Sequence, residues 1–163
     1  MSGIQPKTSA YPWPSLLVDH DLMEAIVAKQ KATGWTYKLG DKIPLEWTSV
    51  PPHEKTDCSG EVRYLLWRCA GVDITDGSPN QHAFIKSHGF KLSDVEAGKL
   101  HDGKVRIAFL SPAMTTSHIG HVLLIRNGKT FESHGSVGPD SRDWTGLGWQ
   151  GHCQLYVLDP RGN

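Results

Sequence analysis

The chain has 163 residues, of which 17 are Lys or Arg and 17 are Asp or Glu, so its formal net charge is zero at pH 7. This balance lacks the basic excess of nucleic-acid-binding domains, and we expect no nucleic-acid partner. No stretch approaches the roughly 18 consecutive apolar residues of a transmembrane helix, so we expect no membrane-spanning segment. The length fits one domain with a substantial core, and we assign residues 1–163 to a single domain.

Residues 1–14 are predicted to form an extended lead-in, because Pro12 and Pro14 disfavour a helix in the residues before them. The first residues also lack the apolar core of a secretory signal. We therefore expect a protein that is made in the cytoplasm without a cleaved signal. The three cysteines are an odd and low number, which indicates no disulfide framework.

The first half of the chain has helical patterns. Apolar spacing predicts a helix over residues 15–31, with Asp21 and Glu24 as a possible capping pair inside it and Gly34 as its end. The Gly- and Pro-containing residues 35–55 read as a loop over the next helix, which is predicted at 58–70. Residues 78–88 form a short third helix that opens with Ser-Pro.

The second half changes to the pattern of strands. Strands are predicted at 105–110, 120–126, 129–134 and 154–158, and the glycine-rich residues 135–151 read as a wrapping loop. Trp144 and Trp149 in that loop could line a cleft or fill a small satellite core, and we weigh the two equally. Helices followed by strands predict the α+β class, with N-terminal helices packed on an antiparallel sheet.

Cys58 stands out as a candidate nucleophile. Asp57 before it can cap the helix and Gly71 can end it, which places Cys58 in the first helical turn. Unpaired backbone N–H groups and the helix dipole favour an anion there, and a cysteine thiolate is such an anion. The alternative is that Cys58 is only a small buried apolar residue, as most free cysteines are.

Two histidines are predicted to face each other across a hairpin. Asn127-Gly128 between two apolar runs is a strong signal for a two-residue turn. If Arg126 pairs with Lys129, then His121 lies opposite His134, with Cβ atoms about 4.5–5.5 Å apart. His121 would then act as a base that His134 orients. Glu132 is displaced by two residues along the strand and is the second candidate for the orienting role.

These motifs resemble the NlpC family of papain-like cell-wall cysteine peptidases. The resemblance is carried by Asp57-Cys58-Ser59-Gly60 before an apolar helix and by the strand that runs from His121 to Asn127-Gly128. It implies a papain-like NlpC-type fold, with Cys58 as the nucleophile, His121 as the general base and His134 as the orienting residue. It further implies that Tyr37 polarises the scissile carbonyl, and that Asp57 and Ser59 hold the substrate peptide. Glu61 departs from the family pattern, because that position usually carries an apolar side chain, and we expect its charge to face solvent or a partner group.

The resemblance implies a hydrolase (a thiol protease or amidase) that cuts amide bonds in the stem peptides of peptidoglycan, with no metal or other cofactor. It would act on the bacterial cell wall after phage lysis or delivery by a secretion machine. A papain-like acyltransferase or deamidase could use the same three residues. His118 and His121 have the spacing of metal ligands, but no matching second pair follows, so a metal enzyme is the weaker alternative. A catalytically dead wall-binding module is the non-enzymatic alternative.

Overall fold

A computed structural model describes residues 13–162, so the first twelve residues of the expected lead-in lie outside the described part of the chain. The helices are α1 (His20–Ala32), α2 (Cys58–Ala70) and α3 (Ser78–Ser87), with short 3-10 turns η1 (Val95–Lys99), η2 (Pro112–Met114) and η3 (Gly148–His152). The strands are β1 (Thr36–Tyr37), β2 (Lys55–Thr56), β3 (Leu92–Ser93), β4 (Val105–Leu110), β5 (His121–Arg126), β6 (Lys129–His134), β7 (Gly138–Asp140) and β8 (Gln154–Asp159). None of the helices in the described part is long and apolar enough to cross a membrane.

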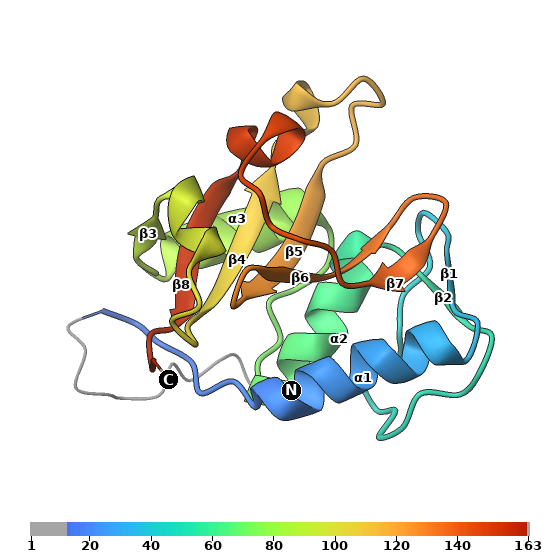
Figure 1. Cartoon of the computed structure of the whole chain (residues 1–163). Helices are drawn as coiled ribbons and strands as arrows, with labels where there is room; N and C mark the ends of the chain where they lie inside the picture. The colour runs from blue at the N-terminus through green and yellow to red at the C-terminus, as the bar shows by residue number, and fades with distance from the viewer. Residues whose placement is uncertain (1–12, 163) are drawn as a thin grey trace.

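The strands form one large sheet in the order β3-β8-β4-β5-β6-β7, and every neighbouring pair is antiparallel. The short strands β1 and β2 pair with each other in parallel. Helix α2 packs against β5 and β6, and α1 packs against α2 and the β6–β7 end of the sheet (Figure 1). The predicted α+β class with an antiparallel sheet is confirmed.

Alternate residues of the strands point to the two faces of the sheet, and each face has its own core. The larger core contains α1, α2 and strand residues such as Ile107 and Val122. The smaller core contains the neighbouring residues Ala108 and Leu123, together with Trp144. The helices thus cover one face, and the chain after β6 covers part of the other face.

The start of α1 differs from the prediction. Residues 15–19 are extended, because the Leu16 N–H donates to the Leu158 carbonyl (2.7 Å) and the Val18 N–H donates to the Asp159 carboxylate (2.8 Å). Leu16 and Val18 are buried while their neighbour Leu17 is exposed, which is the alternation of a strand rather than of a helix. Asp19 caps the helix instead, accepting from the N–H of the residue three positions on.

The predicted hairpin is confirmed, with Arg126 paired to Lys129. Asn127 and Gly128 both have positive φ angles, 52° and 75°, as the tight hairpin turn requires. The region 135–151 is less irregular than predicted, because it contains β7 and most of η3. Strand β7 pairs with β6 from Glu132 onward, and this pairing changes the surroundings of the candidate site.

Candidate active site

Cys58 begins α2, as predicted from the sequence. The Asp57 carboxylate accepts a hydrogen bond from the Gly60 N–H (2.8 Å), and Gly71 ends the helix with a φ of 69°. The Cys58 side chain is only 5% exposed, but it lines an open pocket of about 380 Å³. Its sulfur lies 4.0 Å from the carbonyl oxygen of Gly120, the residue before β5. The start of α2 and the start of β5 therefore meet at the sulfur atom.

His121 is the first residue of β5 and connects Cys58 with the sheet. Its Nε2 lies 2.8 Å from Oε1 of Glu132, which leaves Nδ1 as the ring nitrogen available to Cys58. Burial lowers the pKa of His121, but hydrogen bonds with Cys58 and with Glu132 outweigh burial and raise it to about 9. At neutral pH this imidazole is therefore largely protonated, which suits a partner for a thiolate.

The carboxylate of Glu132 is fully buried and accepts several hydrogen bonds. Besides His121, it accepts from the Thr130 hydroxyl and from Nε (3.0 Å) and Nη2 (2.6 Å) of Arg142. Burial alone would raise the pKa of Glu132, but the bonds from His121 and Arg142 lower it to about 2. The carboxylate therefore stays charged at any pH at which the protein is expected to work, and it can hold His121 in one orientation.

The structure places His134 in a different network from the predicted one. The β5–β6 ladder extends only to Leu124 opposite Phe131, and from Glu132 onward β6 pairs with β7. His134 donates from Nε2 to the Asp140 carboxylate of β7 (2.9 Å) rather than bonding with His121. The prediction that His134 orients His121 is therefore corrected in favour of Glu132, the second candidate.

Tyr37 lies beside the site on β1. It lines a pocket of about 460 Å³ together with His121, His134 and Trp149. Burial raises its pKa to about 12, and the negative charges of Cys58 and Asp57 contribute, so the hydroxyl remains a hydrogen-bond donor. The backbone of the neighbouring residue Thr36 packs closely on Gly138. A Cβ atom added at position 138 would lie 2.8 Å from the Thr36 backbone. This close approach fixes β1 against β7.

Asp57 and Ser59, which the resemblance assigns to substrate binding, already have a partner within the chain. The Lys42 ammonium lies 2.6 Å from one oxygen of Asp57, 2.8 Å from the other and 2.8 Å from the Ser59 hydroxyl. It also lies 3.0 Å from a carboxylate oxygen of Asp76. Asp57 further accepts from the Gly40 N–H at 3.0 Å. Lys42 therefore occupies the position at which these two side chains could hold a cationic group.

Sequence reasoning missed three residues of this network. Arg142 and Lys42 lie in segments whose sequence predicts loops, and Thr130 has the pattern of an ordinary strand residue. The only signal for Thr130 was that it shares the strand face of Glu132 at a spacing of two residues. No local pattern predicts that Arg142 reaches Glu132, because β7 and the turn after it bring the two together.

The other predicted features lie outside this network. Cys69 and Cys153 are buried, and burial raises the pKa of each thiol to about 12. His118 is exposed at the rim of the Cys58 pocket. Within residues 13–162, the one group of three possible metal ligands is His20, Asp21 and Glu24 at the start of α1, and none of these lines the Cys58 pocket.

Glu61 does not face solvent. It is fully buried and accepts a hydrogen bond from Nε2 of Gln30 in α1 (2.8 Å). Burial raises its pKa to about 8. The side chain is therefore mainly a neutral carboxylic acid at neutral pH, which is how the helix interface accommodates it.

Comparisons with known proteins supply no relative: the sequence matches no protein-family model and no curated protein. The family resemblance therefore rests on the motifs around Cys58 and His121 alone.

Proposed function

We propose that this protein is a cysteine hydrolase of amide bonds that works by acyl transfer. The observation that carries the proposal is one continuous arrangement of three side chains. Cys58 lies at a capped helix start, its interaction with His121 helps to raise the pKa of that ring, and Oε1 of Glu132 lies 2.8 Å from Nε2 of His121. Nucleophilic catalysis needs a nucleophile next to a base, and a third group that orients the base.

The proposed reaction has two steps. The Cys58 thiolate attacks the amide carbonyl, and the oxyanion accepts hydrogen bonds from the Cys58 backbone N–H and the Tyr37 hydroxyl. Protonated His121 gives its proton to the leaving amine as the C–N bond breaks, which leaves a thioester on Cys58. Water then attacks the thioester while His121 takes a proton from it, and the carboxylic acid product leaves with the thiolate restored. Glu132 keeps His121 in place throughout.

The substrate class in this proposal comes from the NlpC-type resemblance, which points to stem peptides of peptidoglycan and to an NlpC-type papain-like fold. The bond would lie beside D-glutamate in the stem peptide or at the link between sugar and peptide. Phage lysis or secretion-system delivery would bring the enzyme to the cell wall. Because a thioester can also be attacked by an amine, an acyltransferase remains the chemically nearest alternative, and a deamidase would release ammonia.

The test is to incubate purified peptidoglycan with the protein and with Cys58→Ala, and to identify the products by mass spectrometry. We expect wild-type protein to release fragments with one new amino group for each new carboxyl group, and Cys58→Ala to release none. Fragments joined to an added amine would indicate transfer, and free ammonia would indicate deamidation. Binding of the wild-type protein to the wall without any new fragment would contradict the proposal and favour the binding module.

A further inference from the structure

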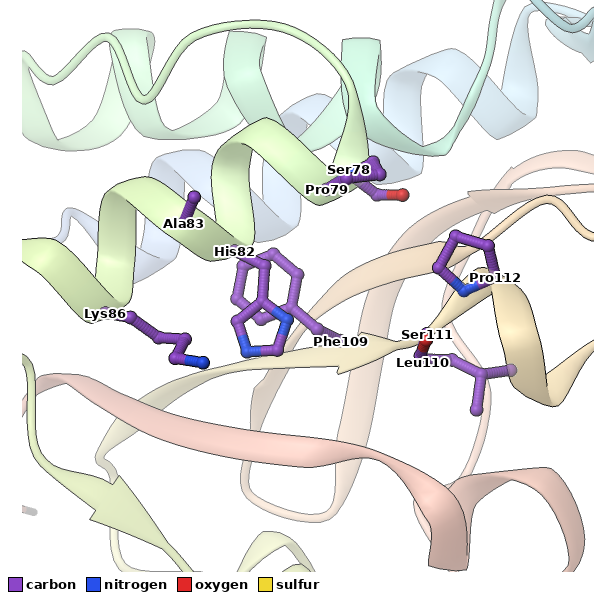
Figure 2. Close-up of a pocket in the computed structure, with 9 residues that line it drawn as sticks. All are labelled: Ser78, Pro79, His82, Ala83, Lys86, Phe109, Leu110, Ser111 and Pro112. Carbon is purple, nitrogen blue, oxygen red and sulfur yellow. The ribbon is translucent and has the colours of Figure 1, made fainter.

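A further pocket, of about 250 Å³, lies between α3 and the end of β4 (Figure 2). It shares Ser78, Pro79 and Pro112 with the pocket that Cys58 lines. Gly120 stands at the junction, where a side chain would lie 2.9 Å from the Ser78 hydroxyl and 2.8 Å from the Leu110 carbonyl. The two pockets therefore adjoin along these residues, and the junction between them is narrow at Gly120.

The floor of this pocket is a stack of two rings. His82 of α3 lies over Phe109 of β4, with 4.4 Å between ring centroids and 2° between ring planes. The Tyr156 hydroxyl donates to Gln154 (3.2 Å), so its oxygen is free to accept from Nε2–H of His82 (2.9 Å). Burial lowers the pKa of His82 and the charge of Lys86 lowers it further, while the Gln154 side chain opposes this shift without reversing it. The ring is therefore neutral, with Nδ1 left as an acceptor for an N–H group.

The charge of the pocket is positive. Lys86 is the only charged residue among its nine lining residues, and no acidic residue lines it. The adjoining Cys58 pocket, in contrast, contains Asp57 and Lys42 paired with each other. Among the ion pairs of residues 13–162 none involves Lys86, and Figure 2 shows its side chain beside the His82 ring. A ligand that crosses the junction from Cys58 therefore meets the exposed, unpaired ammonium group of Lys86 at the far end.

We propose that this pocket is a subsite for the part of the peptide substrate that carries a free carboxylate, with Lys86 as the specificity-determining residue. The apolar side chains of Phe109 and Pro79 contact the intervening peptide, and Nδ1 of His82 accepts from one of its amide N–H groups. Lys86 is eight residues after Ser78 on α3, which is about 12 Å along the helix. An extended peptide spans about 3.3–3.6 Å per residue. Counted from Ser78, this length corresponds to about three to four residues, so the carboxylate lies at least that far from the bond that is cut.

This subsite rests on the proposed function for its substrate class, and two readouts keep the two claims apart. The probes are synthetic stem peptides of two to five residues, each made with a free terminal carboxylate and with a terminal carboxamide. Turnover of each probe is measured with wild-type protein. Equilibrium binding of the same probes is measured calorimetrically with Cys58→Ala, which needs no turnover. Lys86→Gln is introduced into both backgrounds, and Lys29→Gln on exposed α1 is the matched control.

We expect Lys86→Gln to lower the affinity for long free-acid peptides, and kcat/KM where turnover occurs, by about fivefold or more. The loss should be absent for the carboxamides and for the shortest peptides, and Lys29→Gln should change nothing. Selective loss of binding without turnover in wild-type protein would support the subsite and contradict the hydrolase. The subsite would be overturned, and the hydrolase retained, if the free-acid and carboxamide peptides were bound and cut equally well and Lys86→Gln changed neither result. Failure of every probe to bind would also overturn it.

Discussion

Nε2 of His121 lies 2.8 Å from Oε1 of Glu132, a residue displaced by two positions from the one that the hairpin register places opposite His121. A diagonal contact of this kind is within reach of a long side chain on an antiparallel pair. It gives the candidate site a charged orienting group in place of a neutral one. A carboxylate stabilises the imidazolium as well as fixing the ring, and this difference has measurable consequences.

Glu132→Gln should reduce kcat by about a hundredfold or more, because the amide can still bond with His121 but cannot stabilise its positive charge. His134→Ala should cost several-fold at most, because the His134 ring bonds with Asp140 rather than with His121. The measurement is kcat on peptidoglycan fragments, with circular dichroism as the check on folding. A larger loss in folded His134→Ala than in folded Glu132→Gln would show that the assignment is wrong.

The sequence could predict the hairpin but not the choice between these two residues. Turn chemistry at Asn127-Gly128 fixed the register correctly, and the register put His134 opposite His121. The prediction went wrong because the pairing of β5 with β6 ends at Leu124 and Phe131, so the hairpin register does not extend to His121. Three residues of β7 within a glycine-rich segment carry too little periodic signal to be recognised as a strand. The contacts that hold Glu132 depend on that strand.

The upper pH limit of activity should be set by His121. Its pKa is raised from an ordinary 6.5 to about 9, and the proposed acylation step needs the protonated ring. We therefore expect kcat/KM to fall as the pH rises through about 9. The same shift contributes stability that is fully present below pH 6.5 and is lost as the pH rises through 9. Glu132→Gln should move the upper limit to lower pH, since Glu132 is one cause of the raised pKa. An unchanged limit in this variant would contradict the role of Glu132.

Cys58 should be the only thiol that reacts in the folded protein. It lines an open pocket, whereas Cys69 and Cys153 are buried with pKa values raised to about 12. Iodoacetamide at pH 6 should therefore modify one site, identified by peptide mass spectrometry, and abolish activity in proportion. His121→Ala should slow the labelling about tenfold, because the imidazolium stabilises the thiolate. Unfolded protein is the control and should take three labels; faster labelling of Cys69 or Cys153 in folded protein would refute the assignment.

The two tryptophans after β6 should respond differently to truncation. Trp144 is buried and donates from its indole N–H to the Val95 carbonyl (2.9 Å), so Trp144→Ala should lower the unfolding free energy by about 3–5 kcal/mol. The Trp149 ring meets the His121 ring edge-on, with 5.5 Å between ring centroids, and Cζ of Arg142 lies 5.2 Å from the centroid of the Trp149 ring. Trp149→Ala should therefore reduce kcat/KM more than it reduces stability. Equal effects of the two changes on stability, with activity retained in Trp149→Ala, would contradict this division.

The surroundings of the two tryptophans could not be predicted from the sequence. The pattern could not tell whether Trp144 and Trp149 belong to a core or to a cleft, and in the structure one belongs to each. Their positions depend on η3 and on the approach of Gly98, where a side chain would lie 2.4 Å from the Trp144 indole nitrogen. The α2 helix, in contrast, was predictable residue by residue, because its cap, apolar stripe and terminal glycine are all local signals.

Glu61 should make the protein less stable as the pH rises. Its pKa is raised by burial from an ordinary 4.5 to about 8, so the folded state binds more protons than the unfolded state between these values. Stability therefore falls as the pH rises from about 4.5 through 8. Within residues 13–162, the second oxygen of Glu61 and the amide oxygen of Gln30 have no hydrogen-bond partner. When Glu61 is protonated, its second oxygen can donate a hydrogen bond to the amide oxygen of Gln30. Two hydrogen bonds would then join Glu61 of α2 to Gln30 of α1.

Glu61→Gln is the test of this account, because an amide can donate permanently to the Gln30 oxygen and accept from the Gln30 amide N–H at every pH. The measurement is the urea midpoint of the variant and of wild-type protein at pH 6 and at pH 9. We expect similar midpoints at pH 6, where Glu61 is neutral, and a higher midpoint for the variant at pH 9, where wild-type protein must bury a carboxylate. Glu96→Gln, at an exposed acid in η1, is the control and should follow wild-type protein. A variant whose midpoint stays below that of wild-type protein at pH 9 would show that Glu61 is held as a stabilised carboxylate instead.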